Sequence, residues 1–205
     1  MHNEPIETIK YQGYKIEIHV DDHPENPREA WDNLGTLVCW HRRYTIGDEK
    51  GEEAFGTPTD FREWAEENDV IYQPVFMYDH SGITVSTKPF SCRWDSGQLG
   101  YIYVTREELR KQAMQDWDDE HLKKVLAGEI EIFDMYLRGE IYGFIVRNYH
   151  GGIVDSFVDS CWGFYGEDGY REAVAEAKRV VTSDSLERER EGIEAMATLL
   201  ANAYA

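Results

Sequence analysis

Short stretches of alternating or β-branched residues are the feature that most constrains how this chain can fold. In YKIEIHVDD (14–22), Ile16, Ile18 and Val20 alternate with polar residues, which predicts a half-buried strand. TLVCWHRRY (36–44) is β-branched and aromatic and predicts a central strand. Similar stretches at 70–78, 82–87 and 97–105, and on both sides of HGG (150–152), predict the remaining strands.

Helices are expected in groups rather than in strict alternation with the strands. Thr57 and Asp60 form a capping box around Pro58, and Thr105 with Glu108 forms a second one. A helical period of apolar residues runs over 118–140, with a glycine that weakens its middle, and another runs over 170–181.

Together these patterns predict an α+β fold with one antiparallel-rich mixed sheet of about six strands, grouped helices and a helical C-terminal tail. We expect a single α+β domain over residues 1–182 and a tail over 183–205. Ser183 or Ser185 would cap the tail helix. Its apolar stripe either docks on the domain or pairs with a second copy as a homodimer, and consists of Ile193, Met196, Leu199 and Leu200.

The charge of the chain narrows the classes of partner. With 40 acidic and 21 basic residues, the net charge is -19. Direct binding to nucleic acid or to an anionic membrane is disfavoured, because both depend on Lys and Arg. A basic partner is favoured, although the same charge also serves plain solubility. The 3 cysteines are odd in number and widely separated, which points to a reducing cytoplasm.

Three blocks combine polar and aromatic side chains: CWHRRY (39–44), YDHSGITVSTKPFSCRWDSGQ (78–98) and DSCWGFYG (159–166). Polar groups gathered among aromatic rings are the usual form of a ligand site. If the blocks converge, the candidate binding residues are His41, Asp79, His80, Trp94, Asp95 and Trp162.

An enzymatic alternative uses the same blocks. Cys92 would be the nucleophile, His80 the base and Asp95 the orienting group, with Cys161, His41 and Asp79 as alternative members. In the competing interpretation, His80 and Ser81 shape a turn before a glycine. None of the phosphate-loop, dinucleotide, zinc-protease or serine-hydrolase motifs occurs in the sequence, which favours a binding protein over an enzyme.

Metal ligation has weak support. The cysteines and histidines of the three blocks lack the C-x2-4-C pairs that structural zinc sites use, so we expect neither a metal nor a cofactor. Asp21, Asp22 and His23 could hold a divalent cation, but a solvated strand end is the favoured explanation of this cluster.

Acidic residues concentrate in two regions of the chain. Residues 44–104 contain eleven acids and four bases, and residues 116–120 add four acids. Such acids could imitate the phosphate track that a nucleic-acid-binding protein recognises, or they could be ordinary solvated faces. The candidate acidic interaction surface consists of Asp48, Glu49, Glu52, Glu53, Asp60, Glu63, Glu66, Glu67, Asp116, Asp118, Asp119 and Glu120.

The motifs WDNLGTLVCWHRRYTIGDE, YDHSGITVSTKPFSCRWDSGQLGYIYV and DSCWGFYG resemble a family of small, uncharacterised proteins carried by bacteriophages and plasmids. The resemblance covers most of residues 14–166 in order and spacing. It implies a mobile-element setting, in which small acidic proteins are often counter-defence factors such as CRISPR-Cas inhibitors or antirestriction proteins. It carries over no catalytic residue.

Two functional hypotheses follow. In the first, the chain is an acidic inhibitor that binds a basic protein or ribonucleoprotein defence complex of the host and blocks nucleic-acid binding or cleavage. In the second, it is a small enzyme or a nucleotide-binding, signal-sequestering protein with a composite His/Cys/Asp/Trp pocket.

Overall fold

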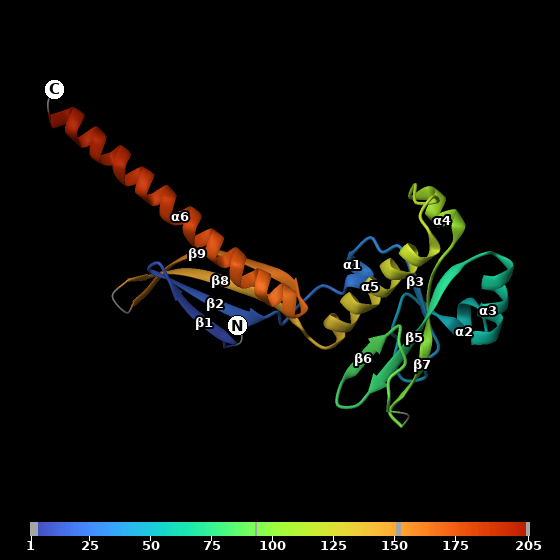
Figure 1. The fold of residues 1–205 in the computed structure, drawn as a ribbon. Helices are drawn as coiled ribbons and strands as arrows, with labels where there is room; N and C mark the ends of the chain where they lie inside the picture. The colour runs from blue at the N-terminus through green and yellow to red at the C-terminus, as the bar shows by residue number, and fades with distance from the viewer. Residues whose placement is uncertain (1–3, 93, 151–152, 204–205) are drawn as a thin grey trace. The chain divides into compact units, whose positions relative to one another are not determined.

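The computed structural model describes residues 4–92, 94–150 and 153–203, and the chain divides into two compact units. Unit 1 comprises Met1–Pro24 and Gly139–Ala205, and unit 2 comprises Glu25–Arg138. Each unit has its own sheet and helices (Figure 1). The predicted α+β class, the predominance of antiparallel strands and the C-terminal helix are confirmed. The strands form two sheets, of four and five strands, where the sequence patterns indicated one sheet of about six.

The sheet of unit 1 is antiparallel and has the order β1-β2-β8-β9. Its strands are β1 (Glu7–Tyr11), β2 (Tyr14–Val20), β8 (Ile141–His150) and β9 (Ile153–Tyr165). The β8–β9 pair was expected, and the two glycines between these strands lie outside the described residues. β1 was not expected, because Ile9 is its only aliphatic residue. Gln12 and Gly13, with φ of 49° and 82°, form the two-residue turn that joins β1 to β2.

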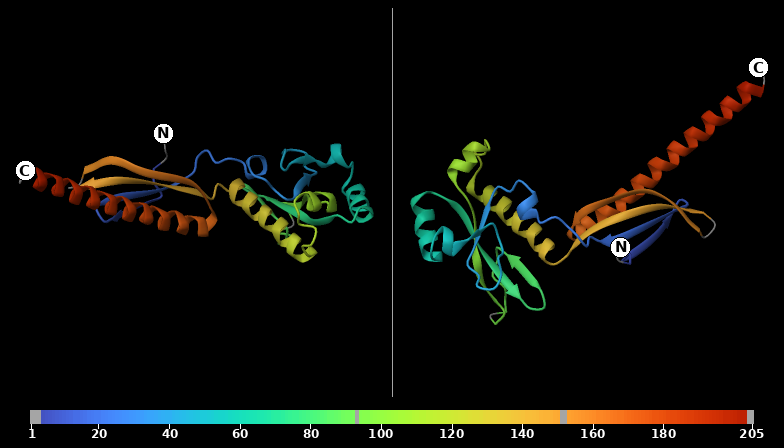
Figure 2. Two further views of the ribbon diagram at one scale, coloured as in Figure 1. Left: turned by 90° about the horizontal axis from the view of Figure 1, so that it is seen from above. Right: turned by 180° about the vertical axis from the view of Figure 1, so that it is seen from behind.

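Helix α6 (Gly166–Ala203) covers one face of this sheet with its N-terminal half (Figures 1 and 2). Ala173, Ala177 and Val181 recur every four residues and pack against Ile18 and Phe144, among other buried residues of the sheet. The helix runs without a break through Ser183 and Ser185, the residues expected to cap a separate tail helix. The expected boundary between residues 182 and 183 therefore falls inside one helix of unit 1.

The sheet of unit 2 has the order β4-β3-β7-β5-β6 and is antiparallel except for the β3–β4 pair. Its strands are β3 (Thr36–Cys39), β4 (Glu49–Lys50), β5 (Ile71–Asp79), β6 (Ile83–Ser86) and β7 (Ser96–Val104). Its helices are α1 (Pro27–Ala30), α2 (Gly51–Ala54), α3 (Pro58–Glu67), α4 (Arg106–Lys111) and α5 (Asp119–Leu137).

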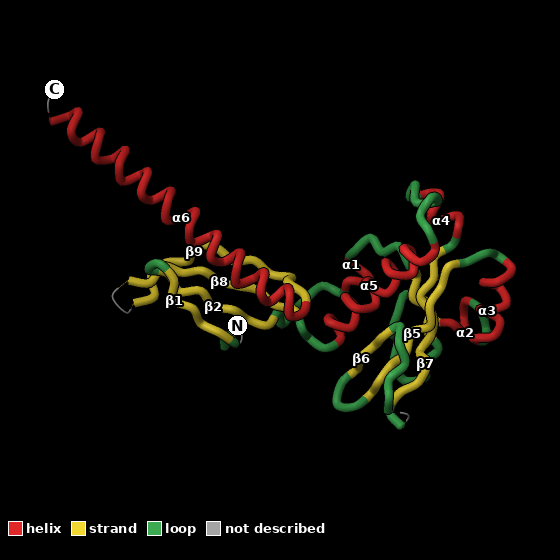
Figure 3. Tube along the Cα trace, in the orientation of Figure 1, coloured by secondary structure: helices red, strands yellow, loops and turns green. Residues whose placement is uncertain are grey.

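Strand β7 contributes to a hydrophobic cluster on each face of this sheet, because successive side chains point to opposite faces. Ile102 and Val104 pack in the cluster that includes residues of α5. Tyr101 and Tyr103 pack with Phe61 of α3 in an aromatic cluster. Figure 3 shows α5 and the α2–α3 pair in red on either side of the strands. Unit 2 is thus a central sheet between two helical layers.

The predicted helix starts are confirmed at α3 and α4. Thr57 accepts a hydrogen bond from the Asp60 amide while the Asp60 carboxylate accepts one from the Thr57 amide, and Thr105 and Glu108 repeat the arrangement. Helix α5 passes Gly128 without a break, because the apolar residues on both sides of this glycine pack into the same cluster.

Candidate functional site

Two of the three polar-aromatic blocks meet in unit 2. A pocket of about 260 Å³ opens between the turn that follows β3, the end of β5 and the start of β7. His41 and Arg43 contribute from the first block, and Asp79, Trp94 and Asp95 from the second. The antiparallel pairing of β5 with both β6 and β7 brings the two ends of the second block together. Two of the three predicted blocks therefore lie side by side around one pocket.

The polar groups on one side of this pocket are hydrogen-bonded to one another. The Asp79 carboxylate accepts hydrogen bonds from Arg43 Nη2 at 3.1 Å and from the Tyr44 hydroxyl at 3.2 Å. The His41 ring stacks on Tyr44 with 5.0 Å between ring centroids, and its Nδ1 accepts a bond from the Tyr44 amide. These contacts order the turn of residues 41–44 and leave fewer free polar atoms for a ligand.

The catalytic alternative has only part of its geometry. His80 Nδ1 lies 3.3 Å from Asp95 Oδ2, as an orienting pair requires. The Cys92 thiol contacts the same Asp95 oxygen, at 3.9 Å. The described residues contain no hydrogen bond between Cys92 and His80, so the thiol has no base beside it. The arrangement can hold a ligand, but it is not an assembled nucleophile–base pair.

Trp94 and Trp162 have different surroundings. Trp94 is 95 % exposed at the rim of the pocket. Trp162 belongs to β9 of unit 1, where its ring fills the space that a side chain at Gly143 would need. A Cβ atom at Gly143 would lie 2.2 Å from that ring. Trp162 therefore packs within the sheet of unit 1.

Several candidate acidic residues are engaged in local structure rather than presented to a partner. Asp60 and Asp118 cap helices, and Asp119 pairs with Arg106 at 2.9 Å. Glu49 accepts a hydrogen bond from the Tyr103 hydroxyl. The remaining pairs are between exposed side chains, Glu53 with Lys50 and Glu120 with Lys123.

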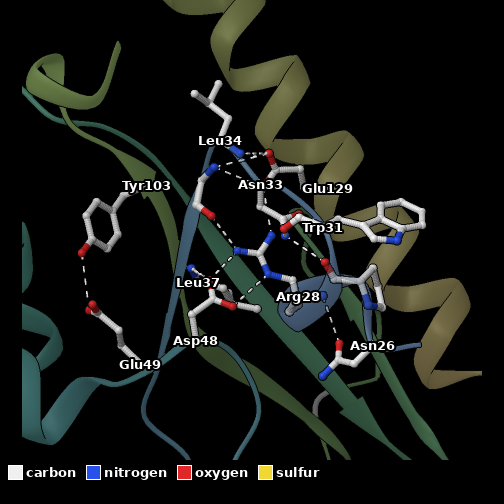
Figure 4. Close-up of polar contacts among 12 residues, drawn as sticks. Asn26, Arg28, Trp31, Asn33, Leu34, Leu37, Asp48, Glu49, Tyr103 and Glu129 are labelled. Atoms are coloured by element: carbon white, nitrogen blue, oxygen red, sulfur yellow. Dashed lines mark hydrogen bonds and ion pairs between the residues drawn. The ribbon is translucent and has the colours of Figure 1, made fainter. Parts of the chain in front are cut away.

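Asp48 is part of a buried ion network that the sequence did not indicate (Figure 4). The Arg28 side chain is 3 % exposed and donates from Nε and Nη2 to the Asp48 carboxylate, with 3.0 Å between Nε and Oδ1. Its Nη1 lies 2.9 Å from Glu129 Oε2 on α5. Glu129 also accepts from the Leu34 amide, and Asp48 from the Leu37 amide. The network joins α1, β3, the loop before β4, and α5.

Burial and charge act in opposite directions on the Arg28 side chain of this network. Burial alone would lower the pKa of the Arg28 guanidinium, but the hydrogen bonds and charges of Asp48 and Glu129 raise it overall. Burial, with Asp48 nearby, raises the pKa of the Cys39 thiol to about 12. Cys39 is therefore a buried thiol that stays protonated at neutral pH.

The acids that are left define the α2–α3 acidic face, which we take as Glu52, Glu63, Glu66 and Glu67. All four side chains are exposed, and none forms an ion pair with another described residue. Glu63, Glu66 and Glu67 lie on the side of α3 opposite buried Phe61. Asp116 is exposed as well, in the turn before α5.

Metal-ligating clusters and membrane-spanning helices are both absent from the described residues. No group of three or more His, Cys, Asp or Glu side chains among them is arranged to hold a metal ion. No helix in the described ranges has the length and apolar character needed to cross a bilayer.

The fold and the candidate site define a two-unit α+β protein with an acidic helical face and a small polar pocket. No family model, no curated protein and no solved structure matches the chain.

Proposed function

We propose that this chain is an acidic interaction protein that binds a basic, nucleic-acid-processing defence effector of a host cell, such as a CRISPR-Cas nuclease, and blocks nucleic-acid binding or cleavage. The observation that carries the proposal is the α2–α3 acidic face. Its carboxylates lack partners in the described chain, whereas most other acids of the same region are engaged in caps and ion pairs.

The acidic face works against the stability of its own helix. Glu63 and Glu67 are like charges four residues apart, which destabilises a helix by a few tenths of a kcal/mol. Glu66 and Glu67 lie in the last turn of α3, which contains no basic residue, although the negative end of the helix dipole favours cations there. Charges that destabilise their own helix are better explained by a partner than by folding.

The support beneath this face is rigid. Phe61 stacks on Tyr101 with ring centroids 4.6 Å apart, and Phe55 and Trp64 pack against the same cluster. A charged face held on packed aromatic rings presents its carboxylates without a large loss of conformational entropy on binding. The resemblance of the three sequence blocks to phage- and plasmid-borne proteins supports a defence effector as the basic partner.

The test is a binding measurement between the full chain and purified Cas or restriction complexes at low and moderate salt. Glu63→Gln/Glu66→Gln/Glu67→Gln should weaken binding at least about tenfold, and added salt should weaken the wild type more than this variant. The matched control is Glu187→Gln/Glu191→Gln/Glu194→Gln, which removes the same charge from exposed positions of α6. Because its acids lie outside the proposed face, the control should bind like the wild type.

Two results would refute the proposal. One is a wild-type chain that retains no such complex at low salt and protects neither a phage nor a plasmid from one. The other is equal weakening by both triple variants, which would mean that only overall net charge matters.

The pocket of unit 2 supports a second candidate, a small-ligand or nucleotide-binding function. The specific observation is that His41, Asp79 and Asp95 come together beside the exposed Trp94 ring, on which a base could stack. Quenching of Trp94 fluorescence by nucleotides, lost in Trp94→Ala, would support it. The pocket is smaller than the 300–1,000 Å³ typical of ligand sites, so we rank it second.

A further inference from the structure

The C-terminal half of α6 extends beyond the sheet on which its first half packs (Figures 1 and 2). Val181 is the last residue of the helix in the buried cluster of unit 1. The Tyr14 hydroxyl then donates a hydrogen bond to Asp184 at 2.6 Å. From 186 to 200 every residue is exposed, while the helix continues to Ala203.

This exposed segment has an apolar stripe. Leu186, Ile193 and Leu200 follow one another at intervals of seven residues, with Met196 and Leu199 beside them. At 100° per residue the five side chains lie on one side of the helix, and Thr198 lies on the opposite side. The five are between 53 % and 67 % exposed, more than half of each side chain. From Ile193 onward the stripe has the spacing of a coiled-coil seam, whereas Glu189 interrupts it between Leu186 and Ile193.

The exposed segment is only marginally stable as a helix in water unless its apolar face is packed. The anchored half of α6 removes the cost of nucleation, because the first turns are already formed against the sheet. What the exposed half lacks is an apolar surface to cover its stripe.

We propose that a second copy of this chain covers the stripe, so that two exposed α6 segments pair as a short coiled coil. Charge favours this partner. Residues 186–203 contain four acids and two bases, a net charge of only -2, and beyond Ile193 only Glu194 is charged, so two copies of a chain of net charge -19 can meet here with little repulsion. Gly192 and Ala197 flank the stripe and are small enough for close helix approach. A basic partner would find few carboxylates to pair with in this segment.

The pairing is expected to be weak. Residues 186–203 span about 27 Å of helix, and a seam of that length buries less than the roughly 800 Å² per partner of a standard interface. For so small an interface we expect a dissociation constant on the order of micromolar.

The test is sedimentation velocity of the full chain over a concentration range of roughly 1 to 100 μM, chosen to bracket that constant. The wild type should move from the 23.9 kDa monomer to a species of twice that mass. Ile193→Glu/Leu200→Glu should weaken the dimer at least about 100-fold, because two charges per chain enter the seam while Glu keeps a high helix propensity. Thr198→Glu, on the opposite side of the helix, should dimerise like the wild type.

Circular dichroism checks that each variant keeps its helix. If the double Glu variant loses helicity, Ile193→Ala/Leu200→Ala takes its place, since Ala removes apolar area and keeps the helix. A wild type that stays monomeric throughout the range overturns the proposal. The proposal is also overturned if the seam variants still form the dimer. It is overturned as well if the chain stays monomeric and its stripe binds phosphatidylcholine vesicles.

Discussion

At the scale of single residues, Arg28 has the largest structural role that the sequence did not indicate. Its guanidinium holds two carboxylates from distant parts of unit 2, Asp48 and Glu129, and also donates to the Gly35 carbonyl at 2.6 Å. Breaking a buried ion pair by removing one partner is costly, because the remaining charges stay buried without compensation.

We therefore predict that Arg28→Met lowers the free energy of unfolding of unit 2 by about 3–5 kcal/mol. The matched control is Lys50→Met, which removes an exposed ion pair with Glu53 and should cost less than about 1 kcal/mol. Urea denaturation followed by tryptophan fluorescence measures both. Adding Asp48→Asn and Glu129→Gln to Arg28→Met should restore part of the loss. An Arg28→Met protein as stable as the wild type would show that the network contributes nothing.

At the scale of elements, the pairing of β2 with β8 places a carboxylate between two cations. Glu17 Oε1 lies 2.6 Å from Lys15 Nζ, and Glu17 Oε2 lies 3.3 Å from Arg147 Nε on the neighbouring strand. Burial alone would raise the pKa of Glu17, but the hydrogen bonds and charges of Lys15 and Arg147 lower it overall. The folded-state pKa therefore lies below the unfolded value of about 4.3.

The direction of this pKa shift determines how the stability of the fold depends on pH. A carboxyl whose pKa is lowered on folding stabilises the fold above its unfolded pKa, and the contribution is lost as the pH falls through the folded pKa. Glu17→Gln should thus cost about 1 kcal/mol at pH 7, with the difference from wild type shrinking below about pH 4. Denaturation curves at a series of pH values measure this, with the exposed Glu187→Gln as a control. If the loss of stability in Glu17→Gln does not change with pH, Glu17 acts through packing and not through its charge.

At the scale of the whole molecule, the chain consists of two units with separate cores. The buried cluster of unit 1 contains residues of β2, β8 and α6, whereas both clusters of unit 2 lie within residues 25–138. One unit can unfold while the other stays folded, so a substitution in one unit need not destabilise the other.

We predict that Arg28→Met accelerates hydrogen exchange in β3 and β7 of unit 2 and leaves the amides of β2 and β8 in unit 1 unchanged. Mass spectrometry of peptides from the two sheets measures this directly. Equal acceleration in both sheets would mean that the units unfold as one.

Local patterns were enough for individual elements. Alternating apolar residues predicted β2, and Thr57 with Asp60 predicted the start of α3, because period and capping depend on neighbours in sequence. No local sequence pattern predicted that the strands would form two separate sheets. β2 pairs with β8 across more than a hundred residues, and nothing local to either strand specifies that choice.

Some features of the candidate site could likewise be predicted from local sequence patterns, and others could not. Residue type and spacing alone predicted the excess of acids, the capping boxes, the three polar-aromatic blocks and the apolar stripe of α6. The folded structure determines which acidic side chains are held in ion pairs and which of the blocks line the pocket of unit 2. Asp48 is held by Arg28 while Glu63 is not, and Trp94 borders the pocket while Trp162 packs in another sheet. These outcomes depend on contacts between residues far apart in the chain, which no local pattern specifies.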